Sequence, residues 1–346
     1  MKILLDKIAS VTKNANLPEK VTVIEKLVVE EGALLVVEAL KNKTIYNQLE
    51  LVSGRLSTIQ KGDILAVALG NRRALKGFVG DLPERLKVGD TIHLLNMGGV
   101  AGICTSQNVK EVGYALKVKV IGAIAKGKKP LNIKQFSLFK GKKRMESTVP
   151  LILISGTCMD VGKTSVACEI LQKGRRKGLH LFAAKLTGVA ALKDVEKMKD
   201  YGAHKSISFV DGGYTSTAKH KGEIVSITKG AIDYLSQSKP DAIVIEFGDG
   251  LLGEYGVEEI LKNADLQNNM AFHIGCAYDP LGAMKLVELC EAMGAPINMM
   301  SGPVTDNSVG VNFIEKTLKI PAVNALTQGE KLFRQMMKEM KKRKKI

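Results

Sequence analysis

Short hydrophobic runs alternate with polar turns over the first third of the chain. Apolar residues recur at 21–24, 34–37 and 64–67, and Gly-Asp pairs at 62–63 and 89–90 interrupt the pattern. Alternation bounded by glycine turns is typical of β-strands. The spacing leaves little room for crossover helices. The pattern therefore predicts a β-rich domain over 1–125, built as a small barrel or sandwich and available for substrate or partner binding.

From residue 149 onward, long apolar runs alternate with helical periods. Such runs are nearly continuous in hydrophobic residues, as buried strands of a parallel sheet are. The expected strands are at 149–155, 179–186, 241–247 and 270–276, and the expected helices are at 164–177, 223–237 and 280–293. This alternation predicts an α/β fold over 149–346, with a doubly wound, mostly parallel sheet and ligands at the carboxyl ends of its strands.

Basic residues are concentrated in two short segments. The formal net charge of the 346-residue chain is +16, and residues 126–144 and 338–345 together carry +13 of it. The first run lies in a weakly patterned stretch with Pro130, which predicts a basic linker over 126–148. The second run forms a basic C-terminal tail. Two interpretations stay open for these runs: nucleic-acid or anionic-surface binding, and a solvated linker and tail.

Composition narrows the class of protein further. Hydrophobic residues make up 45% of the chain and charged residues 25%, as in soluble globular proteins. No apolar run reaches the ~20 residues that a membrane span needs. The five cysteines lack CxxC spacing and the five histidines lack ligand spacing. These features argue against a disulfide framework and a zinc site, and they predict a cytoplasmic protein.

The strongest chemical signal is an apolar run that leads into Gly-Lys-Thr. Residues 151–165 read LILISGTCMDVGKTS. In such a loop the backbone N–H groups form an anion nest, and the following helix directs its positive dipole end at the same point. Lys163 can then reach the β- and γ-phosphates, Thr164 can ligate Mg²⁺, and Gly162 allows close approach. We name residues 156–165 the phosphate loop and predict that it binds ATP with Mg²⁺; the sequence does not separate ATP from GTP.

The spacing within the phosphate loop carries a family resemblance. The pattern GTxxxVGKT resembles the loop of dethiobiotin synthetase, of the ATP-dependent amidotransferases of cobalamin synthesis and, more distantly, of MinD-like ATPases. The resemblance covers residues 149–330. It implies nucleotide contacts from Gly156, Thr157, Asp160, Val161, Gly162, Lys163, Thr164 and Ser165.

This chain departs from the family pattern at three points. Asp160 stands where dethiobiotin synthetases have a glutamate, and Cys158 stands where they have an aspartate. The extra lysine of MinD-type loops is missing, which argues against a MinD-like dimer switch. There is also a looser likeness to two-domain proteins that include N-acyltransferases of D-amino acids. Their N-terminal half is Rossmann-like, whereas the N-terminal half here is β-rich.

The resemblance implies two further site residues. Glu246 follows the apolar run 242–245 and resembles the Mg²⁺-binding glutamate of the family. Lys185 on the second expected strand resembles the second active-site lysine. The resemblance thus implies catalytic roles for Lys163, Lys185 and Glu246, with Thr164 and Glu246 as metal ligands.

Other polar residues follow predicted strands. Asp194, Asp200 and Asp211 come after the second strand, and Asp211 ends the apolar run 207–210. We expect Asp211 to be a second metal ligand or a substrate-binding carboxylate. Asn324 follows the last expected strand, at 320–323, where its amide could read a purine edge of the nucleotide or simply form a turn.

These features predict an ATP- and Mg²⁺-dependent enzyme of the ligase or amidotransferase kind. It would activate a small carboxylate or amine substrate by phosphoryl transfer, with contacts from the glycine-rich loop 96–102 of the β-rich domain. Two other functions stay open: a nucleotide-gated binding or assembly protein that acts as an NTPase switch, and a nucleic-acid-binding protein that uses the basic segments. The sequence does not identify the substrate, and it leaves a homodimer open.

Overall fold

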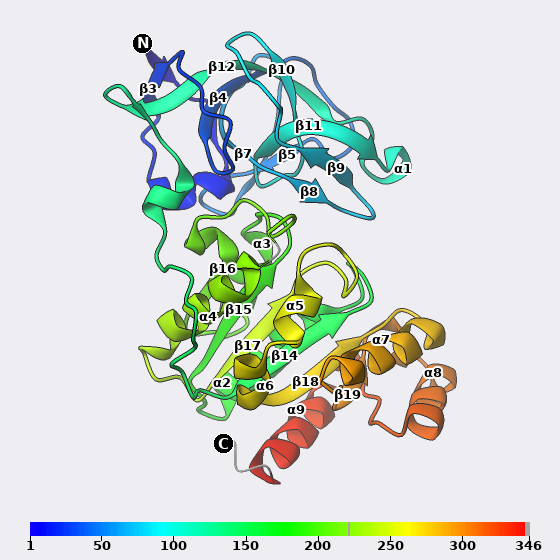
Figure 1. Cartoon of the computed structure of the whole chain (residues 1–346). Helices are drawn as coiled ribbons and strands as arrows, with labels where there is room; N and C mark the ends of the chain where they lie inside the picture. The colour runs from blue at the N-terminus through cyan, green and yellow to red at the C-terminus, as the bar shows by residue number, and fades with distance from the viewer. Residues whose placement is uncertain (221, 343–346) are drawn as a thin grey trace. The chain divides into compact units, whose positions relative to one another are not determined.

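The computed structural model describes residues 1–220 and 222–342. The chain divides into two compact units (Figure 1). Unit 1 contains Met1–Leu138, Val189–Lys193 and Phe209–Lys219, and unit 2 contains Phe139–Gly188, Asp194–Ser208 and His220–Ile346.

Unit 1 is built mainly from short antiparallel strands. The strands are β1 (Lys2–Leu4), β2 (Lys7–Ile8), β3 (Lys20–Ile24), β4 (Leu34–Ala39), β5 (Gln48–Glu50), β6 (Leu56–Thr58), β7 (Ile64–Leu69), β8 (Arg72–Arg73), β9 (Phe78–Asp81), β10 (Thr91–Leu94), β11 (Val100–Gln107), β12 (Leu116–Lys126) and β13 (Lys129–Pro130). The short helices are η1 (Ser10–Ala15), α1 (Val109–Val112), η2 (Ile133–Phe136) and η3 (Phe209–Gly212).

The strand pairings of unit 1 close into a ring. β4 pairs antiparallel with β12 and with β7, and β7 pairs parallel with β11. β10 then joins β11 to β12 with antiparallel pairings on both sides. The β-rich domain that the sequence predicts is therefore a barrel, which satisfies the hydrogen-bonding groups that an open sheet would leave at its edges.

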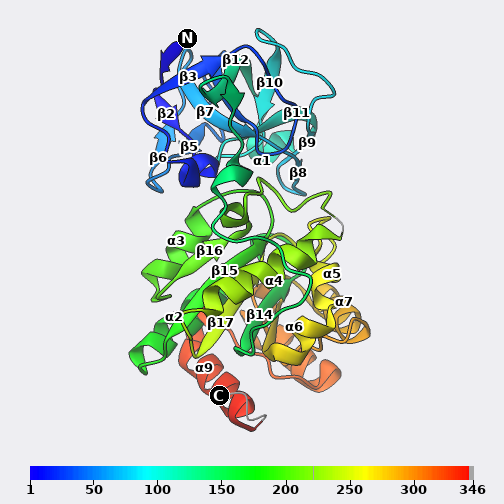
Figure 2. The same cartoon turned by 60° about the vertical axis from the view of Figure 1, so that its left-hand side comes forward.

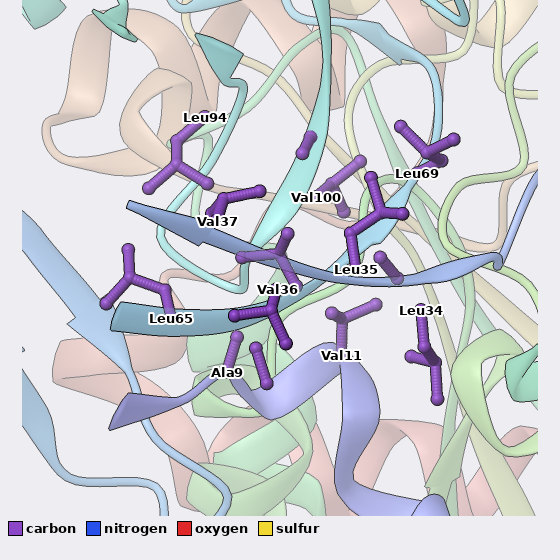
Figure 3. Close-up of a cluster of buried hydrophobic side chains, with 14 of the residues drawn as sticks. Ala9, Val11, Leu34, Leu35, Val36, Val37, Leu65, Leu69, Leu94 and Val100 are labelled. Atoms are coloured by element: carbon purple, nitrogen blue, oxygen red, sulfur yellow. The ribbon is translucent and has the colours of Figure 1, made fainter. Parts of the chain in front are cut away.

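The core of unit 1 lies on both sides of β4. Leu34, Leu35, Val36 and Val37 are consecutive and have no exposed area. Successive side chains of a strand point to opposite faces, so both faces of β4 are covered. Val11 of η1 lies beside this strand and belongs to the same cluster (Figure 3).

Two segments from the second half of the chain belong to unit 1. Residues 189–193 and 209–219 lie between elements of unit 2 in the sequence, yet Ala190, Phe209 and Val210 are part of the barrel core. In the region predicted as a linker, residues 126–138 contain β13 and η2 of unit 1, and residues 139–148 belong to unit 2.

Unit 2 contains a sheet of parallel strands. The strands are β14 (Leu151–Gly156), β15 (Leu181–Thr187), β16 (Ser206–Ser208), β17 (Ala242–Phe247), β18 (Met270–Cys276) and β19 (Met299–Ser301), in the spatial order β16-β15-β17-β14-β18-β19. The helices are α2 (Lys163–Arg176), α3 (Lys193–Asp200), α4 (Glu223–Ser236), α5 (Val257–Leu261), α6 (Ala264–Asn269), α7 (Pro280–Ala292), η4 (Pro303–Thr305), α8 (Ser308–Phe313), η5 (Ile314–Leu318) and α9 (Ala325–Lys342).

The parallel strands of unit 2 confirm the predicted α/β fold for this half of the chain. All neighbouring strands in the sheet pair in parallel, and every residue of β14, β17 and β18 is buried. Helices α2 and α9 pack side by side (Figure 2). The doubly wound arrangement stays a prediction. Within residues 1–220 and 222–342, no helix is both long and apolar enough to cross a membrane.

Candidate functional site: the phosphate loop and its neighbours

The phosphate loop joins β14 to α2 at the carboxyl edge of the parallel sheet. Gly156 ends β14, and a Cβ atom there would come within 2.9 Å of the Cys276 carbonyl oxygen. Gly162, at the N-cap of α2, has φ +89°, and Asp160 has φ +63°. The left-handed region favours glycine and tolerates aspartate. The sequence therefore allows a tight loop that presents backbone N–H groups at a helix N-terminus.

Lys163 is buried and bonded to the loop itself. Its side-chain Nζ donates a hydrogen bond to the Cys158 carbonyl oxygen at 2.6 Å. Burial lowers the pKa of Lys163, although the nearby Glu246 carboxylate acts in the opposite direction. Burial disfavours a charged ammonium unless an anion compensates it, so this position favours a negatively charged ligand.

Glu246 lies next to the phosphate loop because β17 is the sheet neighbour of β14. Ile154 and Glu246 are register partners, and the Thr164 hydroxyl donates to Glu246 Oε1 at 2.9 Å. The other oxygen, Oε2, is buried and has no hydrogen-bond partner among the described residues. Burial raises the pKa of Glu246, against the lowering effect of Lys185. A buried carboxylate oxygen without a partner is costly, so the position suits a cation.

Lys185 and Asp194 complete the cluster of unit 2. Lys185 on β15 is the register partner of Glu246, and its Nζ forms an ion pair with Asp194 Oδ2. Burial alone would lower the pKa of Lys185, but the Asp194 and Glu246 carboxylates outweigh it and raise the pKa. Two lysines and two carboxylates thus meet at the carboxyl ends of β14, β15 and β17.

Asp194 is the acid that sequence reasoning did not single out. The sequence pattern favours Asp211, because that residue ends the apolar run 207–210. In the structure Asp194 lies in the first turn of α3 and reaches Lys185. The signal that could have found it is the short helical pattern 193–200 directly after the strand that carries Lys185.

Asp211 belongs to unit 1, so the structure does not place it with Thr164 and Glu246 in one unit. Its carboxylate forms an ion pair with Lys13 at 2.8 Å and accepts a hydrogen bond from Asn14 at 3.2 Å. These contacts give Asp211 a role in holding its segment within unit 1. The role of Asp211 as a second metal ligand or substrate-binding carboxylate stays a prediction.

Asn324 lies in unit 2 at the start of α9. Its side-chain Oδ1 accepts hydrogen bonds from the backbone N–H groups of Leu326 and Thr327, and its Nδ2 donates to Asp306 at 2.8 Å. These bonds are those of a helix cap. Contact of Asn324 with a purine stays a prediction.

A second loop covers part of the phosphate loop. Leu251 donates its backbone N–H to the Gly156 carbonyl oxygen at 2.8 Å, and a Cβ atom at Gly250 would lie 2.2 Å from the Thr157 carbonyl oxygen. Glycine is therefore required where the chain after Glu246 passes the phosphate loop. Of the predicted loop residues, Val161 is buried and Asp160 is exposed, while Thr157 and Ser165 are partly exposed.

The comparisons with known proteins leave the family unassigned. No protein-family profile matches the chain, and no curated protein matches it. Among solved structures, chloroplast FtsY from Physcomitrella patens is similar over 52% of this chain and 61% of that one, with 12% identity and a TM-score of 0.37. The signal recognition particle receptor FtsY from Elizabethkingia anophelis is similar over 55% and 61%, with 13% identity and a TM-score of 0.35.

A DUF1611 family protein from Anabaena variabilis is similar over 62% of this chain and 66% of that one, with 12% identity and a TM-score of 0.40. Each likeness spans less than two thirds of the other protein's length. At these TM-scores the likenesses carry no functional argument. The resemblance to dethiobiotin synthetase stays a prediction.

Proposed function

We propose that this chain is an ATP- and Mg²⁺-dependent enzyme that activates a small carboxylate or amine substrate by phosphoryl transfer. The observation that carries the proposal is Glu246: one oxygen accepts from Thr164, and the other is buried beside the phosphate loop with no hydrogen-bond partner in the described part of the chain. A threonine hydroxyl at the start of the helix after such a loop and a carboxylate on a neighbouring strand are Mg²⁺ ligands in nucleotide sites.

The residues present fit a nucleotide with its metal ion. Thr164 and Glu246 would hold Mg²⁺, and Asp194 offers a further carboxylate near Lys185. The bound ion would neutralise charge between the β- and γ-phosphates. The backbone of the phosphate loop would bind the phosphate oxygens, and Asp160 and Gly162 supply the backbone conformation that this loop needs.

The two lysines would stabilise negative charge on the transferring group. Lys163 would exchange the Cys158 carbonyl oxygen for a phosphate oxygen, because an anion compensates a buried ammonium better than a neutral carbonyl does. Lys185 is held on a strand and oriented by Asp194. Fixed charges in a buried site stabilise a developing charge without reorganisation, which is the largest contribution that such a site makes.

The test is turnover of nucleotide by the purified full chain. Mg²⁺ with ATP, and in parallel with GTP, is incubated with and without a panel of small carboxylic acids and amines, and phosphate release is measured. We expect turnover of nucleotide only when both Mg²⁺ and one of the small molecules are present. If nucleotide is turned over without a small molecule, and if the affinity of the chain for a macromolecular partner differs between the ATP-bound and ADP-bound states, the result would instead support an NTPase switch. Absence of nucleotide binding by calorimetry would refute both functions.

A further inference from the structure

A fully buried glutamate of the barrel holds the chain segment that leads to Asp194. Glu50 ends β5 and has no exposed area. Its Oε2 accepts the Leu192 backbone N–H at 2.6 Å, and its Oε1 accepts the Lys193 N–H at 2.7 Å. The Ser10 hydroxyl donates to the same carboxylate. Among the described residues, Glu50 forms no ion pair, so these donors are what stabilise its buried charge.

The two N–H groups that Glu50 accepts lie at the N-terminus of α3, directly before Asp194. The first N–H groups of a helix have no partner within the helix, and they carry the positive end of its dipole. A carboxylate from outside the helix therefore caps α3 strongly. Since Asp194 follows Lys193 in the chain, the position of this cap also sets where the Asp194 side chain begins.

The same segment is held at a second point by the glycine-rich loop 96–102. Asn96 donates from Nδ2 to the Ala190 carbonyl oxygen, and its Oδ1 accepts the Val100 N–H at 2.9 Å. A Cβ atom at Gly98 would lie 2.1 Å from the Ala190 carbonyl oxygen. The glycine-rich loop 96–102 thus holds Ala190 within the segment 189–193, and its contact with a substrate stays a prediction.

We propose that Glu50 is a positioning residue that acts through Leu192 and Lys193 to place Asp194 beside Lys185. Asp194 pairs with Lys185 within unit 2, and the segment that precedes it is fixed within unit 1. Loss of the cap allows the start of α3 to move, and the ion pair with Lys185 weakens. The consequence for turnover rests on the proposed function, whereas the consequence for backbone protection does not.

Glu31 provides a matched control. It is also a buried glutamate of unit 1, and its Oε1 accepts the Thr215 N–H at 2.9 Å and the Thr215 hydroxyl at 2.8 Å. It holds the segment 209–219, which pairs with Val189 and Ala190, whereas the N–H groups of Leu192 and Lys193 bond to Glu50. Glu31→Gln therefore removes the same charge from the same unit without touching the cap of α3.

The experiment combines hydrogen exchange with a double-mutant cycle. In Glu50→Gln one acceptor oxygen becomes an NH₂ group that faces a backbone N–H. We expect amides 192–200 to exchange about 10-fold faster and turnover to fall about 10-fold or more. Glu31→Gln leaves exchange at 192–200 unchanged. In the Asp194→Asn background, Glu50→Gln causes no further loss of turnover, because the residue through which it acts is already gone.

The inference and the proposed function fail in different ways. Unchanged amide exchange at 192–200 in Glu50→Gln overturns the inference. It is also overturned if Glu50→Gln lowers turnover as much in the Asp194→Asn background as it does in the wild type. If the wild type shows no Mg²⁺-dependent turnover, the proposed function fails, and the exchange measurement alone decides the inference. If Glu50→Gln does not fold, Glu50→Asp replaces it in the experiment. The aspartate keeps the charge but is one methylene shorter, so we again expect faster exchange of amides 192–200.

Discussion

At the scale of single residues, the pKa values of two buried lysines of one site are shifted in opposite directions. The Lys163 ammonium donates to a carbonyl oxygen, and burial lowers its pKa despite the nearby Glu246 carboxylate. Lys185 has a carboxylate partner, and its pKa is raised. A buried ammonium that no anion compensates fully destabilises the fold. A buried ion pair is different, because the fold is destabilised when either partner is removed. The two positions therefore predict different effects of mutation on the fold.

Lys163→Ala should abolish nucleotide binding and leave the fold intact. The variant loses the cation that meets the phosphates, with turnover falling about 100-fold or more, while the free energy of unfolding stays the same or rises. Calorimetric titration with Mg²⁺-ATP and denaturant unfolding measure the two quantities. Arg176→Ala, at the exposed end of the same helix, is the control. Wild-type ATP affinity in a folded Lys163→Ala variant would contradict the assignment.

Glu246→Gln should raise the Mg²⁺ requirement and lower turnover by orders of magnitude. The amide keeps the shape and one acceptor for Thr164, but it lacks the charge that would bind the ion. Turnover is measured as a function of Mg²⁺ concentration, and nucleotide affinity is measured without metal, where little change is expected. Glu258→Gln on α5 is the matched control. An unaltered Mg²⁺ dependence would rule out Glu246 as a ligand.

At the scale of elements, β18 carries a buried histidine beside the strand that ends in the phosphate loop. His273 Nδ1 lies 2.8 Å from the Ala295 carbonyl oxygen, and Nε2 lies 2.7 Å from the Ser155 hydroxyl. A carbonyl only accepts, so Nδ1 carries the proton and Nε2 accepts from Ser155. The ring is neutral in this arrangement, and burial lowers the pKa of His273 from 6.5 to about 4.

This histidine should make the fold less stable in mild acid. Below pH 6.5 the unfolded chain binds a proton at His273, whereas the folded chain binds it only below a pH of about 4. The stability that the neutral ring contributes is therefore fully present above pH 6.5 and decreases as the pH falls. Linkage gives a loss of about 3 kcal/mol across this window. Urea unfolding of the wild type and of His273→Gln, which does not titrate, measures the difference. Parallel pH profiles for the two proteins would contradict the prediction.

At the scale of the whole molecule, the barrel core includes side chains from two segments of the second half of the chain. Phe209 and Val210 are buried in it with Ala190. Glu50 and Glu31 each bind backbone N–H groups of one of these segments. A cut between the halves of the sequence therefore does not separate two complete cores.

A fragment of residues 139–346 should lose protection in both segments. Without the barrel, Phe209 alone exposes apolar area worth about 2 kcal/mol, and residues 192 and 193 lose the Glu50 acceptor. Hydrogen exchange should be faster at 189–193 and 209–219 than in the full chain, whereas β14 and β17 keep their protection as internal controls. Slow exchange at both segments in a soluble fragment would show that the barrel is not needed to hold them.

Much of the candidate site follows from local sequence. Lys163 and Thr164 directly follow Gly162 of their loop, and Glu246 and Lys185 lie near the carboxyl ends of apolar runs that form strands of the parallel sheet. Parallel strands bring their carboxyl ends to one edge, so a residue at the end of each strand lies near the others. Asp194 is harder to find, because it lies in α3, and a helix of eight residues gives a weak periodic signal.

The sequence by itself determined a β-rich domain, the α/β sheet and the phosphate loop, because each depends on local alternation, turn residues and a strand–loop–helix pattern. It left a barrel and a sandwich open for the β-rich domain, and the strand pairings of the structure decided for the barrel. Only the tertiary structure decided that Asp211 binds Lys13, that Asp194 binds Lys185, and that Glu50 caps the segment before Asp194. Glu50 and Lys193 are far apart in the chain, and a lone acid in a β-rich sequence resembles a surface residue. The physical reason is that a buried charge is revealed only by the donors that the fold brings to it.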